Sequence, residues 1–152
     1  MQVAFKYYPY LLKDEVLNRN SMEGKCFEEA ELWYLVFSII HAADAFHSQG
    51  RKLGDVRPLN VFISPEGQVR VATQFSWPNE QTNYLKTVFE KEPTYLSPEE
   101  LKDIGYGKLE ESANFALNES FSVGLTCLDA ATLSDASLLY EHNNKFNYAQ
   151  LE

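Results

Sequence analysis

Apolar residues recur at three- and four-residue steps between Phe27 and His47, which is the strongest periodic pattern in the chain. Its apolar members are Leu32, Leu35, Val36, Ile39, Ala42, Ala43 and Phe46. This spacing predicts a long helix. Glutamates crowd its first turns, where the helix dipole favours acids, and Gly50 can end it. Because the apolar content is high all round, we expect this helix to be buried deep in the domain.

Shorter patterns on either side of this helix predict a strand, a helix and a hairpin. Residues 2–10, "QVAFKYYPY", are rich in Val, Phe and Tyr and predict a strand that stops at Pro9. Residues 11–20, "LLKDEVLNRN", can form a short helix. The apolar runs 61–64 and 68–72 flank "PEG", which predicts a β-hairpin.

The second half of the chain predicts further helices. Ser97 is a good N-cap, Pro98 suits the first helical position, and Glu100 follows three residues after the cap. An apolar stripe predicts another helix from Phe121, and Ser134 can cap a last short helix. Strands and helices are mixed without repeated βαβ units, so we expect an α+β, mainly helical fold.

Composition narrows the class of protein. A chain of 152 residues with 45% hydrophobic and 14% aromatic residues suits a single domain with a packed core. The longest apolar run, residues 32–40, is too short to span a membrane, and no signal region follows Met1. Cys26 and Cys127 lie far apart, so they indicate neither a metal site nor a disulfide framework. We therefore expect a cytoplasmic protein.

The charge balance bears on the choice of partner. Thirteen Lys and Arg residues are scattered among twenty-two Asp and Glu residues, which gives a net charge of −9. No basic stripe is present, so nucleic acid and membrane are not expected as partners. An acidic protein can still hold a nucleotide in a local pocket.

One short segment after the long helix carries the clearest chemistry. Residues 53–60, "LGDVRPLN", resemble the catalytic loop of eukaryotic protein kinases, which reads H-R-D-L-x-x-x-N and precedes two short strands. In this resemblance Asp55 falls on the catalytic Asp and Asn60 on the metal-binding Asn. Arg57 falls where many kinases carry a Lys that contacts phosphate, and His47 matches the histidine that commonly ends the preceding helix.

Two further motifs follow in the order that the family has them. "YLSPEEL" resembles the A-P-E signature at residues 97–99, and "NESFSVGLTCL" resembles the start of the large central helix, with Glu119 in place of its Asp. The resemblance implies one partial protein-kinase-like domain, a C-lobe with an incomplete N-lobe. Its parts would be a hinge strand (1–10), helices (11–49), the catalytic-loop-like segment and hairpin (50–75), an activation-segment-like stretch (76–99) and C-lobe helices (100–152).

The departures from the family bear on activity. Leu53 and Gly54 replace the His and Arg of the catalytic loop, and the Asp of the D-F-G motif would fall at Thr73 or Gln74, neither of which is an anion. In kinases that Asp holds magnesium, a hard cation that favours carboxylate oxygen. The chain also lacks a Gly-rich loop and a V-A-I-K strand. It thus resembles a pseudokinase.

Each candidate residue has two interpretations. Asp55 could be a general base, or it could stabilise its own loop by hydrogen bonds. Asn60 could bind a metal or close the loop, and Arg57 could bind phosphate or form an intramolecular pair. We favour the structural interpretation for all three and expect no bound metal.

Two hypotheses about function follow. The first is a catalytically inactive pseudokinase, without cofactor, that acts as a protein-interaction or regulatory scaffold. It would bind another protein through the exposed hinge strand and the side where the N-lobe is missing. The second is a fragment of an active protein serine/threonine kinase that uses ATP and Mg²⁺. A weaker third is a module that binds nucleotide without catalysis.

Overall fold

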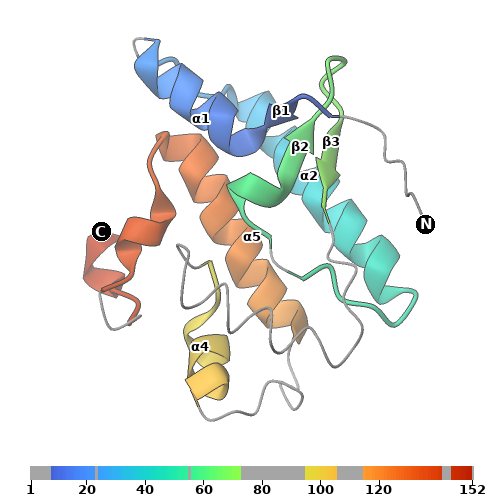
Figure 1. Cartoon of the computed structure of the whole chain (residues 1–152), viewed down its shortest axis with the longest axis vertical. Helices are drawn as coiled ribbons and strands as arrows, with labels where there is room; N and C mark the ends of the chain where they lie inside the picture. The colour runs from blue at the N-terminus through green and yellow to red at the C-terminus, as the bar shows by residue number, and fades with distance from the viewer. Residues whose placement is uncertain are drawn as a thin grey trace, which may run out of the picture.

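The computed structural model describes residues 8–22, 24–54, 56–72, 95–105, 115–141 and 145–151. The helices are α1 (Leu12–Ser21), α2 (Glu29–His47), α4 (Pro98–Gly105) and α5 (Phe115–Thr132). The strands are β1 (Tyr10–Leu11), β2 (Val61–Ile63) and β3 (Val69–Val71). Short 3₁₀ turns occupy Pro58–Asn60, Ala136–Leu139 and Tyr148–Gln150. The described residues thus form a mixed α/β, mostly helical structure with a small sheet, as the sequence predicted (Figure 1).

The three strands form one antiparallel sheet in the order β1-β2-β3. The predicted hairpin is confirmed, because β3 runs antiparallel to β2, with Val61 paired to Val71 and Ile63 to Val69. The N-terminal strand differs from the prediction. It was expected to stop at Pro9, but β1 comes after that proline, at Tyr10–Leu11, and pairs with β2. A proline lacks the N–H that a ladder needs, and the pairing described for β1 starts at the residue after it. Residues 1–7 lie outside the described residues.

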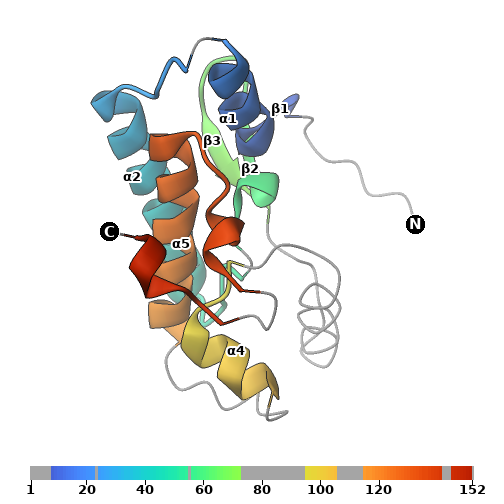
Figure 2. The ribbon, with the colours of Figure 1, turned by 90° about the vertical axis from the view of Figure 1, so that its left-hand side faces the viewer.

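The main core lies between the sheet and the two long helices. Figures 1 and 2 both show α5 beside α2, and α1 near one end of that pair. Buried apolar side chains come from α1, α2, the segment after α2, the sheet and the end of the chain around α5. They are Leu12, Val16, Leu35, Ile39, Leu53, Val56, Val61, Val69, Val123, Ala130 and Leu133. The catalytic-loop-like segment is therefore part of the core rather than an appended loop.

Helix α2 is buried on one side only, which corrects the expectation that it lies deep in the domain. Leu35 and Ile39 are its buried residues, and they face the core. Trp33 and Phe37 are exposed on the other side. The apolar residues of α2 therefore lie on two faces, one buried against the core and one exposed to solvent. Cys26 is exposed just before the helix.

The start of α2 is fixed by an ion-pair network. Glu28 and Glu31 form a capping box, in which the Glu28 N–H donates to the Glu31 carboxylate at 2.7 Å. Arg19 of α1 donates two hydrogen bonds to Glu31, at 2.8 and 2.9 Å, and one to Glu15 at 2.8 Å. The hydrogen bonds from Arg19 lower the pKa of Glu31 to about 2. This network connects α1 to α2 at the edge of the sheet.

A second, smaller cluster is formed by Tyr95, Leu125, Ala136 and Phe146, with further side chains of α5 packed against it. The predicted last helix is instead a 3₁₀ turn at Ala136–Leu139. Its cap is Asp135, whose carboxylate accepts from the Ser137 N–H at 2.9 Å, and not Ser134 as predicted. In the part of the chain that the structure describes, no helix has the length and apolarity needed to cross a membrane.

Candidate functional site

The catalytic-loop-like segment runs from the end of α2 to the hairpin and is hydrogen-bonded to side chains of α5. Val56 is completely buried, and its carbonyl accepts a hydrogen bond from the Thr126 hydroxyl at 3.3 Å. At the far end, the Asn60 N–H donates to the Arg57 carbonyl at 2.8 Å, and the Asn60 carbonyl accepts from the Ala72 N–H at 2.8 Å. These bonds close the segment onto the hairpin. Asp55, the candidate general base, lies outside the described residues.

Glu119 of α5 anchors the start of this segment. The side chain is buried, and its Oε1 accepts a hydrogen bond from the Gly54 N–H at 3.0 Å. Its Oε2 lies 2.6 Å from Nε2 of His47, the last residue of α2. Gly54 has a φ of +91°, a backbone conformation that favours glycine. One carboxylate therefore ties the end of α2, the turn after it and α5 together.

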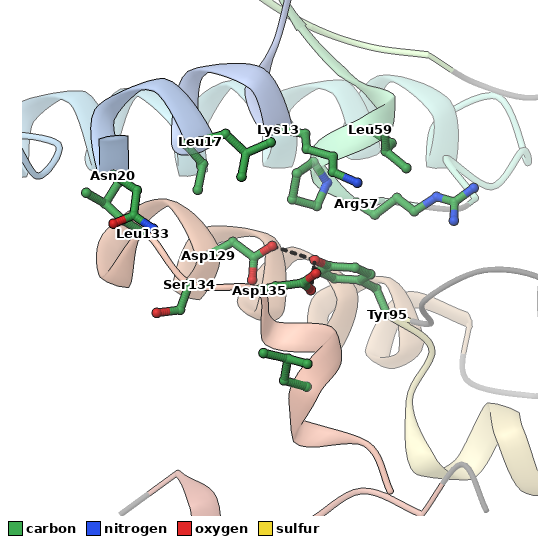
Figure 3. Close-up of a pocket in the computed structure, with 13 residues that line it drawn as sticks. Lys13, Leu17, Asn20, Arg57, Leu59, Tyr95, Asp129, Leu133, Ser134 and Asp135 are labelled. Carbon is green, nitrogen blue, oxygen red and sulfur yellow. Dashed lines mark hydrogen bonds between the residues drawn. The ribbon is translucent and has the colours of Figure 1, made fainter. Parts of the chain in front are cut away.

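Arg57 is buried and lines a cavity of about 340 Å³ between α1, the catalytic-loop-like segment and the end of α5 (Figure 3). Apolar side chains make most of its wall, and four charged residues contribute to it. The lining residues are Lys13, Val16, Leu17, Asn20, Arg57, Pro58, Leu59, Tyr95, Asp129, Leu133, Ser134, Asp135 and Leu138. The cations come from α1 and the loop segment, and the acids from the end of α5 and the turn after it. Such a cavity suits an amphipathic group better than a purely apolar one.

A buried carboxylate on one wall of this cavity has a perturbed pKa. Asp129 accepts hydrogen bonds from the Tyr95 hydroxyl and from the Ala136 N–H. Burial nevertheless raises the pKa of Asp129 to about 6, because the charged form loses solvation. Burial, followed by the hydrogen bond to Asp129, raises the pKa of Tyr95 above its usual value. This hydrogen bond joins the residues before α4 to the end of α5 (Figure 3).

The segment that resembles the A-P-E signature is fixed onto α5. The Ser97 hydroxyl accepts from the Glu100 N–H at 3.0 Å, which confirms the predicted helix cap, and donates to Oδ1 of Asn118 at 2.7 Å. The Ser122 hydroxyl donates to the Tyr95 carbonyl at 2.7 Å. These bonds place the segment beside the cavity rather than leaving it as a free loop.

Two of the predicted site residues, Arg57 and Asn60, are among those that the structure describes. Arg57 lines the cavity and Asn60 joins the hairpin, whereas Asp55, Thr73 and Gln74 lie outside the described residues. Within the described ranges, no group of three or more His, Cys, Asp or Glu side chains could hold a metal ion.

Sequence reasoning missed Tyr95 and Asp129. Nothing in the pattern singles out Tyr95. Asp129 follows Leu125 by four residues, which places an acid on the buried face of the predicted helix. A charged residue on an apolar face could have been noticed, because such groups are rarely buried without partners.

A second hollow, of about 430 Å³, adjoins β1 and the hairpin turn, on the side where the sequence predicted a partner surface. Tyr10 and Tyr34 lie at its exposed edge, and the Arg19 ion-pair network contributes its charged part. The lining residues are Tyr10, Leu12, Glu15, Arg19, Phe27, Glu31, Tyr34, Leu35, Ile63, Ser64, Pro65, Gly67 and Val69.

The chain has a detectable relative among known proteins. It is 26% identical over 126 residues, or 80% of its length, to the membrane-associated tyrosine- and threonine-specific cdc2-inhibitory kinase wee-1.3 of Caenorhabditis elegans. This similarity supports a distant relationship to protein kinases. The chain spans only 17% of the length of that relative. No protein-family model matches the chain.

Proposed function

We propose that this chain is a non-catalytic, protein-kinase-like C-lobe module that acts by binding another protein. One observation supports this most directly. The catalytic-loop-like segment is anchored by the buried Glu119, while the metal-binding position of the D-F-G motif falls at Thr73 or Gln74, both of which are neutral. The interactions that fix the catalytic-loop-like segment are thus present. The D-F-G carboxylate that phosphoryl transfer needs is replaced by a neutral residue.

The donor set does not fit a magnesium ion. Asn60 offers an amide oxygen, and positions 73 and 74 offer a hydroxyl and an amide. Mg²⁺ prefers carboxylate and phosphate oxygens, and much of its value in phosphoryl transfer is charge neutralisation. Asp55 and Arg57 are therefore assigned here to the shape of the segment, and no cofactor is assigned to the module.

The proposed partner surface is the hollow beside β1. β1 is the first strand in the sheet order, with β2 on one side, and Tyr10 on it is half exposed. The hollow next to it is lined mainly by apolar and aromatic side chains, with two acids and one arginine. A partner could add a strand beside β1 and place an apolar side chain in this hollow.

A fragment of an active protein kinase is the alternative function. The similarity to wee-1.3 supports it, because that protein is a tyrosine- and threonine-specific kinase, and the chain spans only a small part of it. The cavity beside Arg57 would then receive a substrate segment. ATP and Mg²⁺ would be required, and residues elsewhere in a longer protein would supply the missing carboxylate.

Nucleotide binding separates the two functions. We expect ATP at millimolar concentration, with or without Mg²⁺, to leave the melting temperature of the purified chain unchanged. A ligand that binds only the folded state must raise it by mass action. A Mg²⁺-dependent rise that disappears in Asn60→Ala would contradict the non-catalytic function and favour the kinase fragment.

The partner surface has its own test. Proteins captured from a cell extract by the wild-type chain should be lost with Tyr10→Glu, which places a charge beside the hollow. The matched control is Tyr148→Glu near the other end of the chain, because Tyr148 is similarly exposed, 61% against 52% for Tyr10. Equal loss with both variants, or with neither, would contradict binding at β1.

A further inference from the structure

Helix α2 carries an apolar stripe on the side that faces away from the core. Its large members are Trp33, Tyr34, Phe37 and Ile40, which are 66%, 49%, 67% and 55% exposed. Figure 2 shows the N-terminal half of α2 at the left-hand edge of the molecule, with α5 on its inner side. Single exposed apolar residues are ordinary, but a contiguous group on one helix face indicates an interaction surface.

The stripe has the spacing of a helix-pairing seam. Ala30, Trp33, Phe37 and Ile40 follow one another at steps of three, four and three residues, and all four are exposed. These are the a and d positions of a heptad, which meet a second helix in a coiled coil. The buried residues of the same helix belong to a separate face.

Contacts within the stripe hold its rings along the helix. The Trp33 Nε1–H donates to the Glu29 carboxylate at 3.2 Å, and the Phe37 ring stacks on His41 with centroids 6.0 Å apart and an interplanar angle of 3°. Side chains that are already ordered lose less conformational entropy when a partner binds. The stripe is thus partly preorganised.

We infer that this stripe is a homodimer interface, in which α2 helices of two copies pack antiparallel about a two-fold axis level with residue 35. That level is the midpoint of the stripe from Ala30 to Ile40. The register places Trp33 opposite Phe37 of the second copy, and the small Ala30 opposite the larger Ile40. A two-fold interface must be self-complementary, and this one pairs aromatic with aromatic and small with large.

The groups that meet in this register all come from the stripe of α2 itself. A surface that complements itself across a two-fold axis needs only a second copy of the chain as its partner. We therefore take a second copy as the occupant of the stripe.

The area of the stripe sets the strength of the dimer. An aromatic residue buries about 150–250 Å² when covered, so four large side chains exposed by half to two thirds offer about 500 Å² per copy. Two copies would bury about 1,000 Å², the low end for a specific interface. The dimer should therefore depend on concentration and coexist with the monomer. This inference does not depend on the proposed function.

Sedimentation velocity of the whole chain over a concentration series tests the dimer. The average mass should rise from 17.4 kDa towards twice that value. Trp33→Glu and Phe37→Glu should each weaken dimerisation about tenfold or more. Leu117→Glu, on α5, is the matched control and should dimerise as the wild type does, since Leu117 is also 62% exposed. Far-ultraviolet circular dichroism and melting temperature would verify that each variant is folded.

Single-cysteine variants test the register, in a background in which Cys26 is replaced by Ser and Cys127 by Ala. A mixture of Ala30→Cys and Ile40→Cys should form a mixed disulfide on oxidation, while Ala30→Cys alone should not cross-link to itself. Self-cross-linking of Ala30→Cys would contradict the antiparallel arrangement. A monomeric mass at every concentration, or equal weakening by Leu117→Glu, would overturn the dimer itself.

Discussion

The Glu119 carboxylate accepts a hydrogen bond from the Gly54 N–H at 3.0 Å, across 65 residues of sequence. The other oxygen of the same carboxylate lies 2.6 Å from Nε2 of His47. A buried acid is costly unless it is paired, and here both oxygens have partners. This relationship fixes the start of the segment on α5, next to the core positions of Leu53 and Val56.

Glu119→Ala should destabilise the chain by about 2–3 kcal/mol, because it leaves the Gly54 N–H without its acceptor and removes the partner of His47. Urea unfolding followed by circular dichroism measures this loss. The control is Glu141→Ala, since Glu141 is an exposed glutamate after the turn that follows α5, and its loss should cost about 0.5 kcal/mol or less. Equal costs for the two variants would show that Glu119 is not an anchor.

Gly54→Ala should cost about 1–2 kcal/mol through the backbone alone. Gly54 has a φ of +91°, and an added Cβ would meet no atom within 4 Å, so the cost comes from conformation rather than from a clash. Gly124 provides the opposite case. It is exposed within α5 with open space around its Cα, so Gly124→Ala should stabilise the chain by about 0.5–1 kcal/mol. Thermal unfolding of both variants should give shifts of opposite sign.

The pKa of Asp129 makes stability depend on pH. Burial raises it from 3.8 to about 6, so the folded state holds a proton there that the unfolded state has already lost. The folded state therefore binds more protons between these two values, and the free energy of unfolding falls as pH rises from about 4 to about 6. Below pH 4 both states are protonated, and above pH 6 the contribution is constant. The fall is at most ~3 kcal/mol.

Unfolding by urea at several pH values, for wild type and Asp129→Asn, measures this contribution. The variant carries a neutral side chain at every pH, so its free energy of unfolding should fall less steeply between pH 4 and pH 6. An unchanged slope in Asp129→Asn would assign the pH dependence to other groups and contradict the raised pKa.

Arg19→Lys should cost about 1 kcal/mol, although the charge is conserved. Arg19 makes two parallel hydrogen bonds to Glu31 and lies 3.8 Å from the ring centroid of Phe27, and a lysine reproduces neither arrangement. The pair is partly exposed, so a larger cost is not expected. Arg70→Lys on the exposed face of β3 is the control and should change the free energy of unfolding by less than about 0.5 kcal/mol. No difference between the two variants would show that the network contributes little.

Local patterns were enough to predict most of the elements. The periodicity after Phe27 predicted α2, the two apolar runs predicted the hairpin, and Ser97 predicted the start of α4. These features depend on neighbouring residues, so a single sequence contains them. The end of the N-terminal strand was predicted at Pro9, whereas β1 lies beyond it, because the position of β1 depends on pairing with β2, a contact between distant parts of the chain.

The candidate site was less predictable because it too depends on contacts between distant parts of the chain. Glu119 was assigned from a family resemblance, but its partners Gly54 and His47 are defined only by the packing of α5 under the segment. The Tyr95–Asp129 pair depends on where α5 ends relative to the residues before α4. The exposed side of α2 was mistaken for core because an apolar pattern does not reveal how many of its faces have a neighbour.

Nuclear magnetic resonance can test directly whether a metal–nucleotide site remains at the catalytic-loop-like segment. The experiment is a titration of the isotopically labelled chain with ATP and Mn²⁺. A paramagnetic ion broadens the signals of nearby backbone amides. We expect the amides of Gly54 and Asn60 to broaden no more than that of Leu151, an exposed residue near the end of the chain. Saturable broadening centred on Asn60 that requires ATP would mean that a metal–nucleotide site persists, and the assignment of this segment to shape alone would be wrong.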